Sequence, residues 1–122
     1  MNAKTSINSI FILLTIMLSS CKHGIKFKVK NRSELLIEKA IITNGVNDVK
    51  LKNLANGKTK TLTLDFSNNK LTNDGSYGIK VKFSDRVNLS KKFGYFSNGL
   101  PSDSRFEINV TKDTIIVSEK EN

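Results

Sequence analysis

The chain has 122 residues and a formal net charge of +9 at pH 7, with 20 lysines and arginines against 11 aspartates and glutamates. This length suits one small domain rather than two. A single cysteine excludes an internal disulfide framework, so the domain must be held together by its hydrophobic core.

The first 21 residues have the parts of an export signal. Lys4 gives a short basic region, residues 10–18 are almost entirely apolar, and small serines precede Cys21. The apolar run is shorter than the roughly 18 residues that cross a bilayer. The motif Leu18-Ser19-Ser20-Cys21 resembles the lipobox of bacterial lipoproteins. The resemblance implies that Cys21 is diacylated on sulfur and becomes the first mature residue. The alternative is an ordinary secretory signal followed by an unpaired thiol.

The signal divides the chain into four parts. We expect residues 1–20 to be a removable lipoprotein signal peptide, 21–24 the lipidated cysteine with a short tether, 25–118 the folded domain, and 119–122 a polar C-terminal tail. Two or more acyl chains would anchor the mature protein permanently.

Hydrophobic alternation with a period of two dominates the chain after Cys21. Ile25, Phe27 and Val29, for example, alternate with lysines. The strand expected over residues 87–95 is predicted to bend at residues 90–92. The pattern predicts an all-β fold, a single seven- to eight-stranded Greek-key β-sandwich that is immunoglobulin-like in general architecture. The expected strands are 25–30, 35–43, 49–51 or 46–51, 61–66, 77–83 and 87–95, followed by 106–110 and 115–117 as one strand or two.

One local pattern supports a Greek-key sandwich. The sequence Asn73-x-Gly75-x-Tyr77 resembles a tyrosine corner, in which the tyrosine hydroxyl bonds to backbone a few residues upstream. Asn73 stands where immunoglobulin-type domains have aspartate. The alternative is a glycine-containing loop that precedes a tyrosine.

Catalysis is not expected. The only histidine, His23, lies in the tether, and the acidic residues are spread along the chain. The Asn- and Asp-rich segment 65–74 lacks the spacing of an EF-hand loop and is typical of a turn. We therefore expect no catalytic residue, no metal and no cofactor.

The segment 93–101 is the most distinctive part of the mature chain, because it holds three aromatics, two glycines and the only proline. Its exposed aromatics could bind a sugar or a protein partner. Alternatively, Phe93 and Tyr95 form the core face of a strand, which leaves Phe96 pointing outward. The candidate binding residues are Phe93, Tyr95, Phe96, Asn98 and Gly99.

A row of basic residues follows the anchor and forms a candidate basic patch. These side chains could contact anionic headgroups. Alternatively, strand 25–30 is a sheet edge whose lysines discourage pairing with other chains. A third possibility is that the basic surface only keeps the domain soluble. The members of the patch are Lys22, Lys26, Lys28, Lys30 and Arg32.

Two further features bear on location. Asp113-Thr114-Ile115 resembles the Asp-Ser/Thr-aliphatic sequence used by Bacteroidota for envelope O-glycosylation, which makes Thr114 a candidate site. The chain as a whole resembles the small envelope lipoproteins of that phylum. Surface-displayed members carry an acidic stretch after the cysteine, whereas no acid precedes Glu34 here. The resemblance implies a lipid anchor in the cell envelope on a periplasm-facing leaflet.

These observations favour a non-enzymatic, membrane-anchored protein-interaction module. Its partner would be an envelope protein, with the module acting as an assembly component or as an inhibitor or immunity-type partner. The alternative is a binding module for an acidic glycan or for lipid headgroups. Export, together with only three arginines and no RNA-binding motif, argues against nucleic acid as a partner.

Overall fold

The computed structural model describes residues 24–66, 74–84, 88–97, 100–101 and 104–121, and these residues form eight strands and no helix. The predicted signal peptide and the lipidated Cys21 lie outside the described residues. The strands are β1 (Gly24–Arg32), β2 (Ile37–Thr43), β3 (Asp48–Leu54), β4 (Thr59–Asp65), β5 (Gly75–Phe83), β6 (Leu89–Phe96), β7 (Ser104–Thr111) and β8 (Ile115–Glu121).

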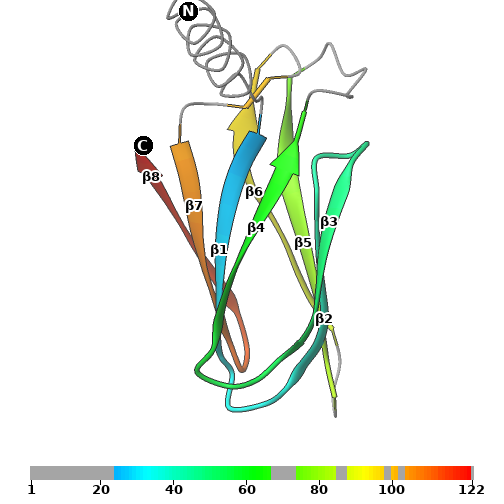
Figure 1. Ribbon diagram of the computed structural model, residues 1–122, viewed down its shortest axis with the longest axis vertical. Helices are drawn as coiled ribbons and strands as arrows, with labels where there is room; N and C mark the ends of the chain where they lie inside the picture. The colour runs from blue at the N-terminus through cyan, green and yellow to red at the C-terminus, as the bar shows by residue number, and fades with distance from the viewer. Residues whose placement is uncertain (1–23, 67–73, 85–87, 98–99, 102–103, 122) are drawn as a thin grey trace, which may run out of the picture.

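The strands pair into two four-stranded sheets that face each other (Figure 1). Sheet A has the order β4-β1-β7-β8, and sheet B has the order β3-β2-β5-β6. All pairs are antiparallel except β1 and β7, which are parallel. The predicted all-β sandwich is confirmed. Its Greek-key and immunoglobulin-like detail stays a prediction.

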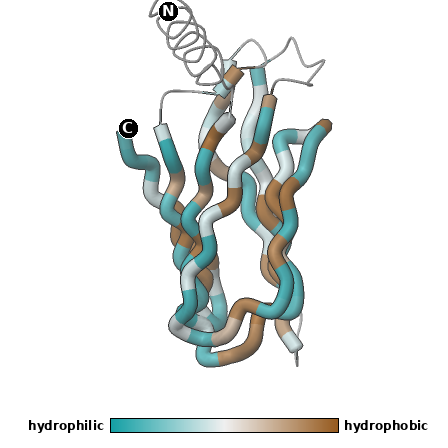
Figure 2. Tube along the Cα trace, viewed as in Figure 1, coloured by the Kyte–Doolittle hydropathy of each residue, from teal (hydrophilic) through white to brown (hydrophobic). Residues whose placement is uncertain are grey.

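The core follows from the alternation in the sequence. Along β1, Ile25, Phe27 and Val29 are at most 1% exposed, while the lysines between them point outward. Figure 2 shows the same change between hydrophobic and hydrophilic residues along several strands. Apolar side chains on one face of each strand are buried between the sheets, where each fully buried large side chain contributes roughly 1.5–3 kcal/mol.

Aromatic rings fill one part of this core. Tyr77 on β5 is fully buried, and its ring centroid lies 5.3 Å from that of Phe27 and 5.5 Å from that of Phe106. Phe66, Phe93 and Phe96 complete the cluster around it. The Tyr77 hydroxyl is also buried and has no hydrogen-bond partner among the described residues. The upstream residues of the expected tyrosine corner, 67–73, lie outside the described residues.

A buried asparagine joins two loops at the far end of β1. The Asn31 side-chain amide donates to the carbonyls of Leu35, at 2.7 Å, and Leu54, at 2.8 Å. Its Oδ1 accepts bonds from the backbone N–H and the hydroxyl of Ser33. Because Asn31 is fully buried and its amide group is bonded at both ends, it ties the β1–β2 connection to β3 without leaving a polar group unpaired.

Three expectations about the strands are wrong. Strand β1 is not a sheet edge, because it pairs with both β4 and β7. Strand β8 continues to Glu121, so residues 119–121 belong to the sheet rather than to a polar tail. The bend expected at residues 90–92 of β6 is not there. The irregularity of β6 lies at residues 93–96, opposite the point between Gly75 and Tyr77 where the pairing of β5 with β6 shifts.

Candidate functional site

The expected binding segment 93–101 presents a different aromatic from the one predicted. Phe93 is 8% exposed and Phe96 only 3%, whereas Tyr95 is 56% exposed. The expectation that Tyr95 lies in the core and Phe96 points outward is therefore wrong.

A bulge at Gly94 explains the change. Tyr77 pairs with Phe93 and Gly75 with Phe96, so β6 has one more residue than β5 over this interval. Gly94 takes a φ of +66°, which glycine adopts without steric cost. The extra residue places Phe93 and Phe96, three positions apart, on the same inner face.

After β6 the backbone folds back on itself. The backbones of Ser97 and Leu100 exchange two hydrogen bonds of 3.2 and 3.0 Å. A hydrogen bond with Asp74 raises the pKa of the exposed Tyr95 hydroxyl, and Asp74 also accepts a 3.3 Å bond from Ser97. Asn98 and Gly99 lie outside the described residues. Tyr95 and Leu100, the latter 49% exposed, are the apolar side chains that this segment leaves in solvent.

The predicted basic patch lies on the outer face of sheet A. The alternation of β1 points Lys26, Lys28, Lys30 and Arg32 away from the core, while Lys22 lies outside the described residues. Arg105 on β7 and Lys120 on β8 lie directly opposite each other on the same face. We call these six side chains the sheet A basic face.

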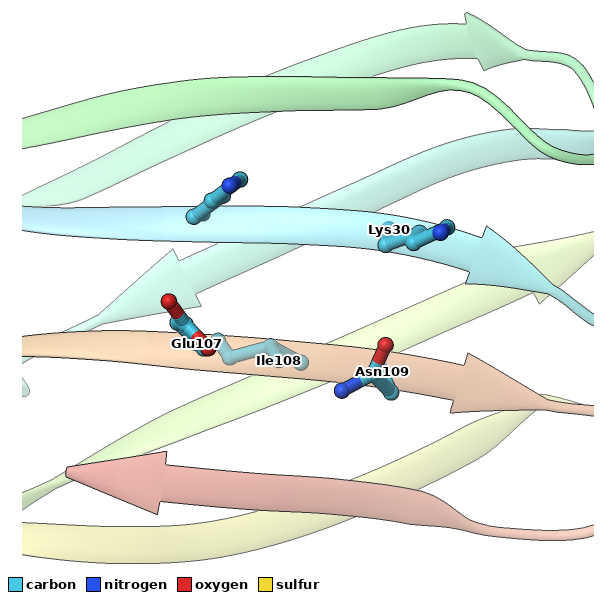
Figure 3. Close-up of a pocket in the computed structure, with 5 residues that line it drawn as sticks. Lys30, Glu107, Ile108 and Asn109 are labelled. Atoms are coloured by element: carbon cyan, nitrogen blue, oxygen red, sulfur yellow. The ribbon is translucent and has the colours of Figure 1, made fainter. Parts of the chain in front are cut away.

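A shallow hollow of about 90 Å³ lies on this face between β1 and β7, lined in part by Lys28 and Lys30. Figure 3 shows Lys30 on β1 near Asn109 on the neighbouring strand, with Glu107 farther along that strand beyond Ile108. The pairing register places Lys28 opposite Glu107 and Lys30 opposite Asn109. The hollow therefore combines cationic and amide donors with one carboxylate.

The outer face of sheet B carries a second set of lysines, which was not singled out from the sequence. Lys39 on β2 lies directly opposite Lys52 on β3 and Lys82 on β5. In the next row, Ile41 lies between Lys50 and Lys80. We call the set the sheet B lysine face. Its members are Lys39, Lys50, Lys52, Lys80, Lys82 and Lys92.

The spacing of these lysines follows from sheet geometry. Neighbouring strands lie about 5 Å apart, and residues on one face of a strand repeat about every 7 Å. Like charges directly opposite each other destabilise a sheet. Within this face, Glu38 approaches Lys82 at 3.6 Å, and Asp48 lies opposite Thr43. Six ammonium groups and two carboxylates leave the surface strongly positive.

The sheet B lysine face is also hollowed. A groove of about 520 Å³ runs over β2, β3, β5 and β6, and a second hollow of about 180 Å³ shares Ile41 and Lys80 with it. Gly78 lies in the groove lining, where a Cβ would meet only Thr43 and the Lys91 carbonyl at 3.7 and 4.0 Å. The missing side chain at Gly78 thus keeps the groove open between lysines.

Thr114, the candidate glycosylation site, is exposed in the turn that joins β7 to β8. Its backbone N–H donates to the Thr111 hydroxyl at 3.1 Å, and its carbonyl accepts from the Thr111 backbone at 2.9 Å. Thr114 therefore precedes the strand rather than starting it, in a tight turn at the end of the sandwich opposite Gly24.

Comparison with known proteins gives no relative: no family model matches the chain, and no curated protein or solved structure shows significant similarity to it. Across the described ranges, no helix is long and apolar enough to span a membrane. Among those same residues, no three His, Cys, Asp or Glu side chains gather as ligands for a metal ion would.

Proposed function

We propose that the protein is a non-enzymatic binding module of the bacterial cell envelope, anchored through acylated Cys21, which binds an acidic polysaccharide on the sheet B lysine face. One observation carries the proposal: six lysines share the outer face of sheet B, and two of them, Lys80 and Lys92, line an open groove of about 520 Å³ together with Lys91 and Asp48. Because directly opposed lysines cost stability, binding of an anion gives a physical reason for placing three of them in one row.

The chemistry of the face favours a polymer with repeated negative charges. Lysine is a flexible point charge and lacks the fork that lets arginine hold one carboxylate in fixed geometry. A field of lysines therefore binds charge density with little demand on orientation. The groove gives such a chain a path across the strands, and the apolar side chain of Ile41 and the bare backbone of Gly78 lie along that path.

The test is calorimetric titration of the lipidated protein, held in neutral detergent, with polygalacturonate and with uncharged dextran. We expect polygalacturonate to bind and dextran not to bind. Affinity should fall steeply as salt rises from about 0.1 M to about 1 M, because the screening length shortens from about 10 Å to about 3 Å. Equal binding of both polymers, or affinity that does not depend on salt, would contradict the proposal.

A protein partner, which the sequence favoured, becomes the second candidate, and it is supported by the four strands that lie at sheet ends. Strands β4 and β8 bound sheet A, and β3 and β6 bound sheet B. A partner could add a strand to such an edge. Crosslinking in the native envelope, with Cys21→Ser as the unanchored control, tests this candidate. A stoichiometric protein partner lost in the control, with no polysaccharide binding, would favour it over the first.

A further inference from the structure

We propose that the sheet A basic face rests on the anionic headgroups of the membrane, so that the sheet B lysine face points away from the bilayer. The inference rests on the lipid anchor of the proposed function, but not on its acidic polysaccharide. It concerns how the domain is oriented at its own membrane.

The position of β1 links the anchor to sheet A. Strand β1 begins at Gly24, three residues after Cys21, so the tether reaches at most about 10 Å. Because β1 is an interior strand of sheet A, this short tether starts within the sheet and not at its side. The outer face of sheet A is therefore within reach of the surface that holds the acyl chains.

The side chains of sheet A suit a headgroup layer. Six basic residues project from it, against the carboxylates of Asp65 and Glu107. Exposed hydroxyls of Thr59, Thr61 and Thr63 line β4 beside the lysines of β1. These groups are donors for phosphate oxygens, and each basic residue near an anionic surface adds to attraction.

An apolar side chain completes the face. Ile116 on β8 is 50% exposed and lies opposite Asn109, in the row that also holds Lys30. An exposed isoleucine among basic residues can enter the boundary between headgroups and acyl chains. Lys28 and Lys30 also line the hollow of about 90 Å³ between β1 and β7, together with Glu107 and Asn109.

The outer faces of sheets A and B also differ in the size of the hollows that they carry. Sheet A carries a hollow of about 90 Å³, whereas the groove of sheet B has about 520 Å³. The smaller hollow suits contact with a planar membrane, and the larger groove suits a polymer chain. Because the sheets pack face to face, their outer faces point in opposite directions (Figure 1). Seating sheet A on the bilayer therefore leaves sheet B free.

A lysine footprint tests the orientation. The lipidated protein is placed in vesicles of phosphatidylcholine with phosphatidylglycerol, or of phosphatidylcholine alone, and is then acetylated under identical conditions. Mass spectrometry follows each lysine. In the anionic vesicles we expect acetylation of Lys26, Lys28 and Lys120 to slow by about fivefold. Lys50 and Lys80 should react at the same rate in both vesicles.

Paired variants make the outcome decisive. Lys28→Gln with Lys30→Gln should remove the protection of Lys26 and Lys120, whereas Lys80→Gln with Lys92→Gln should leave it intact. Equal protection of both sheets, protection of sheet B alone, or no difference between the vesicles would each overturn the orientation. Absence of acyl chains on Cys21 in the intact mass would overturn it together with the anchor. Failure of polygalacturonate binding would overturn the proposed ligand without affecting the orientation.

Discussion

Gly94 determines which aromatic side chains of β6 face the core. An added Cβ there would lie 2.6 Å from Cζ of Phe106 and 3.0 Å from Cδ2 of Tyr77, and the φ of +66° already disfavours any other residue. We predict that Gly94→Ala lowers the free energy of unfolding by about 3 kcal/mol, from backbone strain and overpacking together. Urea unfolding measures the change.

Gly57 provides the matched control for this substitution. Its φ is +81°, but a Cβ would meet nothing within 4 Å. Gly57→Ala should therefore cost only the backbone term, about 1 kcal/mol. If the two substitutions lowered the free energy of unfolding by the same amount, crowding against Phe106 and Tyr77 at position 94 would not contribute to the loss.

The buried hydroxyl of Tyr77 is expected to lower the stability of the folded state. The hydroxyl is buried without a partner among the described residues, and burial, with a smaller effect from Glu119, raises its pKa well above the ordinary 10.0. A buried, unpaired hydroxyl costs about 1 kcal/mol or more. We predict that Tyr77→Phe raises the free energy of unfolding at neutral pH by about 1 kcal/mol.

The same residue makes stability depend on alkaline pH. Because the pKa of Tyr77 is higher in the folded state, the folded protein keeps the phenolic proton that the unfolded chain releases above about pH 10. The free energy of unfolding should therefore fall as the pH rises beyond that value, and Tyr77→Phe should reduce the slope. Urea unfolding from neutral to alkaline pH gives both results. An unchanged slope would show that Tyr77 is not desolvated as described.

At the scale of elements, Asn31 is the residue that holds the loops at one end of the sandwich. Replacing it with alanine removes the side-chain partner of the Leu54 carbonyl and of the Ser33 backbone N–H, whereas the Leu35 carbonyl keeps its bond from the Ser33 hydroxyl. We predict that Asn31→Ala lowers the free energy of unfolding by about 3 kcal/mol.

Asn56 serves as the control for Asn31. Its side chain accepts one bond, from the backbone of Glu34, and it is exposed. Water can replace that bond, so Asn56→Ala should cost less than about 1 kcal/mol. Equal losses in the two variants, measured by thermal unfolding, would contradict the structural importance of the buried Asn31.

Gly78 allows the groove of sheet B to be filled without changing its charge. Valine fits a β-strand, and a Cβ at this position makes only ordinary contacts, so the fold should be retained. We predict that Gly78→Val lowers the affinity for polygalacturonate by about tenfold, because the side chain occupies the groove. Unchanged affinity in titration would show that the ligand is held by charge alone and does not enter the groove.

The sequence predicts elements better than the relations between them. Alternation predicted seven or eight strands, because the burial of one strand face leaves a pattern in residues that are close in sequence. It did not reveal the exchange of Tyr95 and Phe96, since one inserted residue at Gly94 reverses every later side chain. Nor did it reveal that β1 is an interior strand, because partners in a sheet depend on distant segments.

The candidate site, too, could be predicted from the sequence only in part, because it is formed by residues of different strands. The alternation of Lys80 and Lys82 with buried residues was visible in the sequence, but their lysine neighbours come from other strands. Only the register places Lys39 between Lys52 and Lys82. A positive surface formed across several strands becomes recognisable when the pairing is known, and the net charge of +9 is the single sign of it in the composition.

The whole molecule is a sandwich with a basic surface on each side. Apolar residues from both sheets form one continuous core between them. The two basic surfaces differ in what they offer: a face with the smaller hollow next to the start of β1, and a grooved face on the opposite sheet. This arrangement is the one that the proposed function needs, with one basic surface for the membrane and the other for an acidic polymer.

Comparison of matched charge variants tests the central claim most directly. Lys80→Gln with Lys92→Gln removes two charges from sheet B, and Lys28→Gln with Lys30→Gln removes two from sheet A. The measurement is the affinity of the lipidated protein for polygalacturonate in neutral detergent at low salt. We predict that the sheet B pair weakens binding by about thirtyfold, at roughly 1 kcal/mol per lysine, and that the sheet A pair changes it by less than about threefold. Equal effects of the two pairs, or a larger effect of the sheet A pair, would contradict the assignment of the binding surface to sheet B.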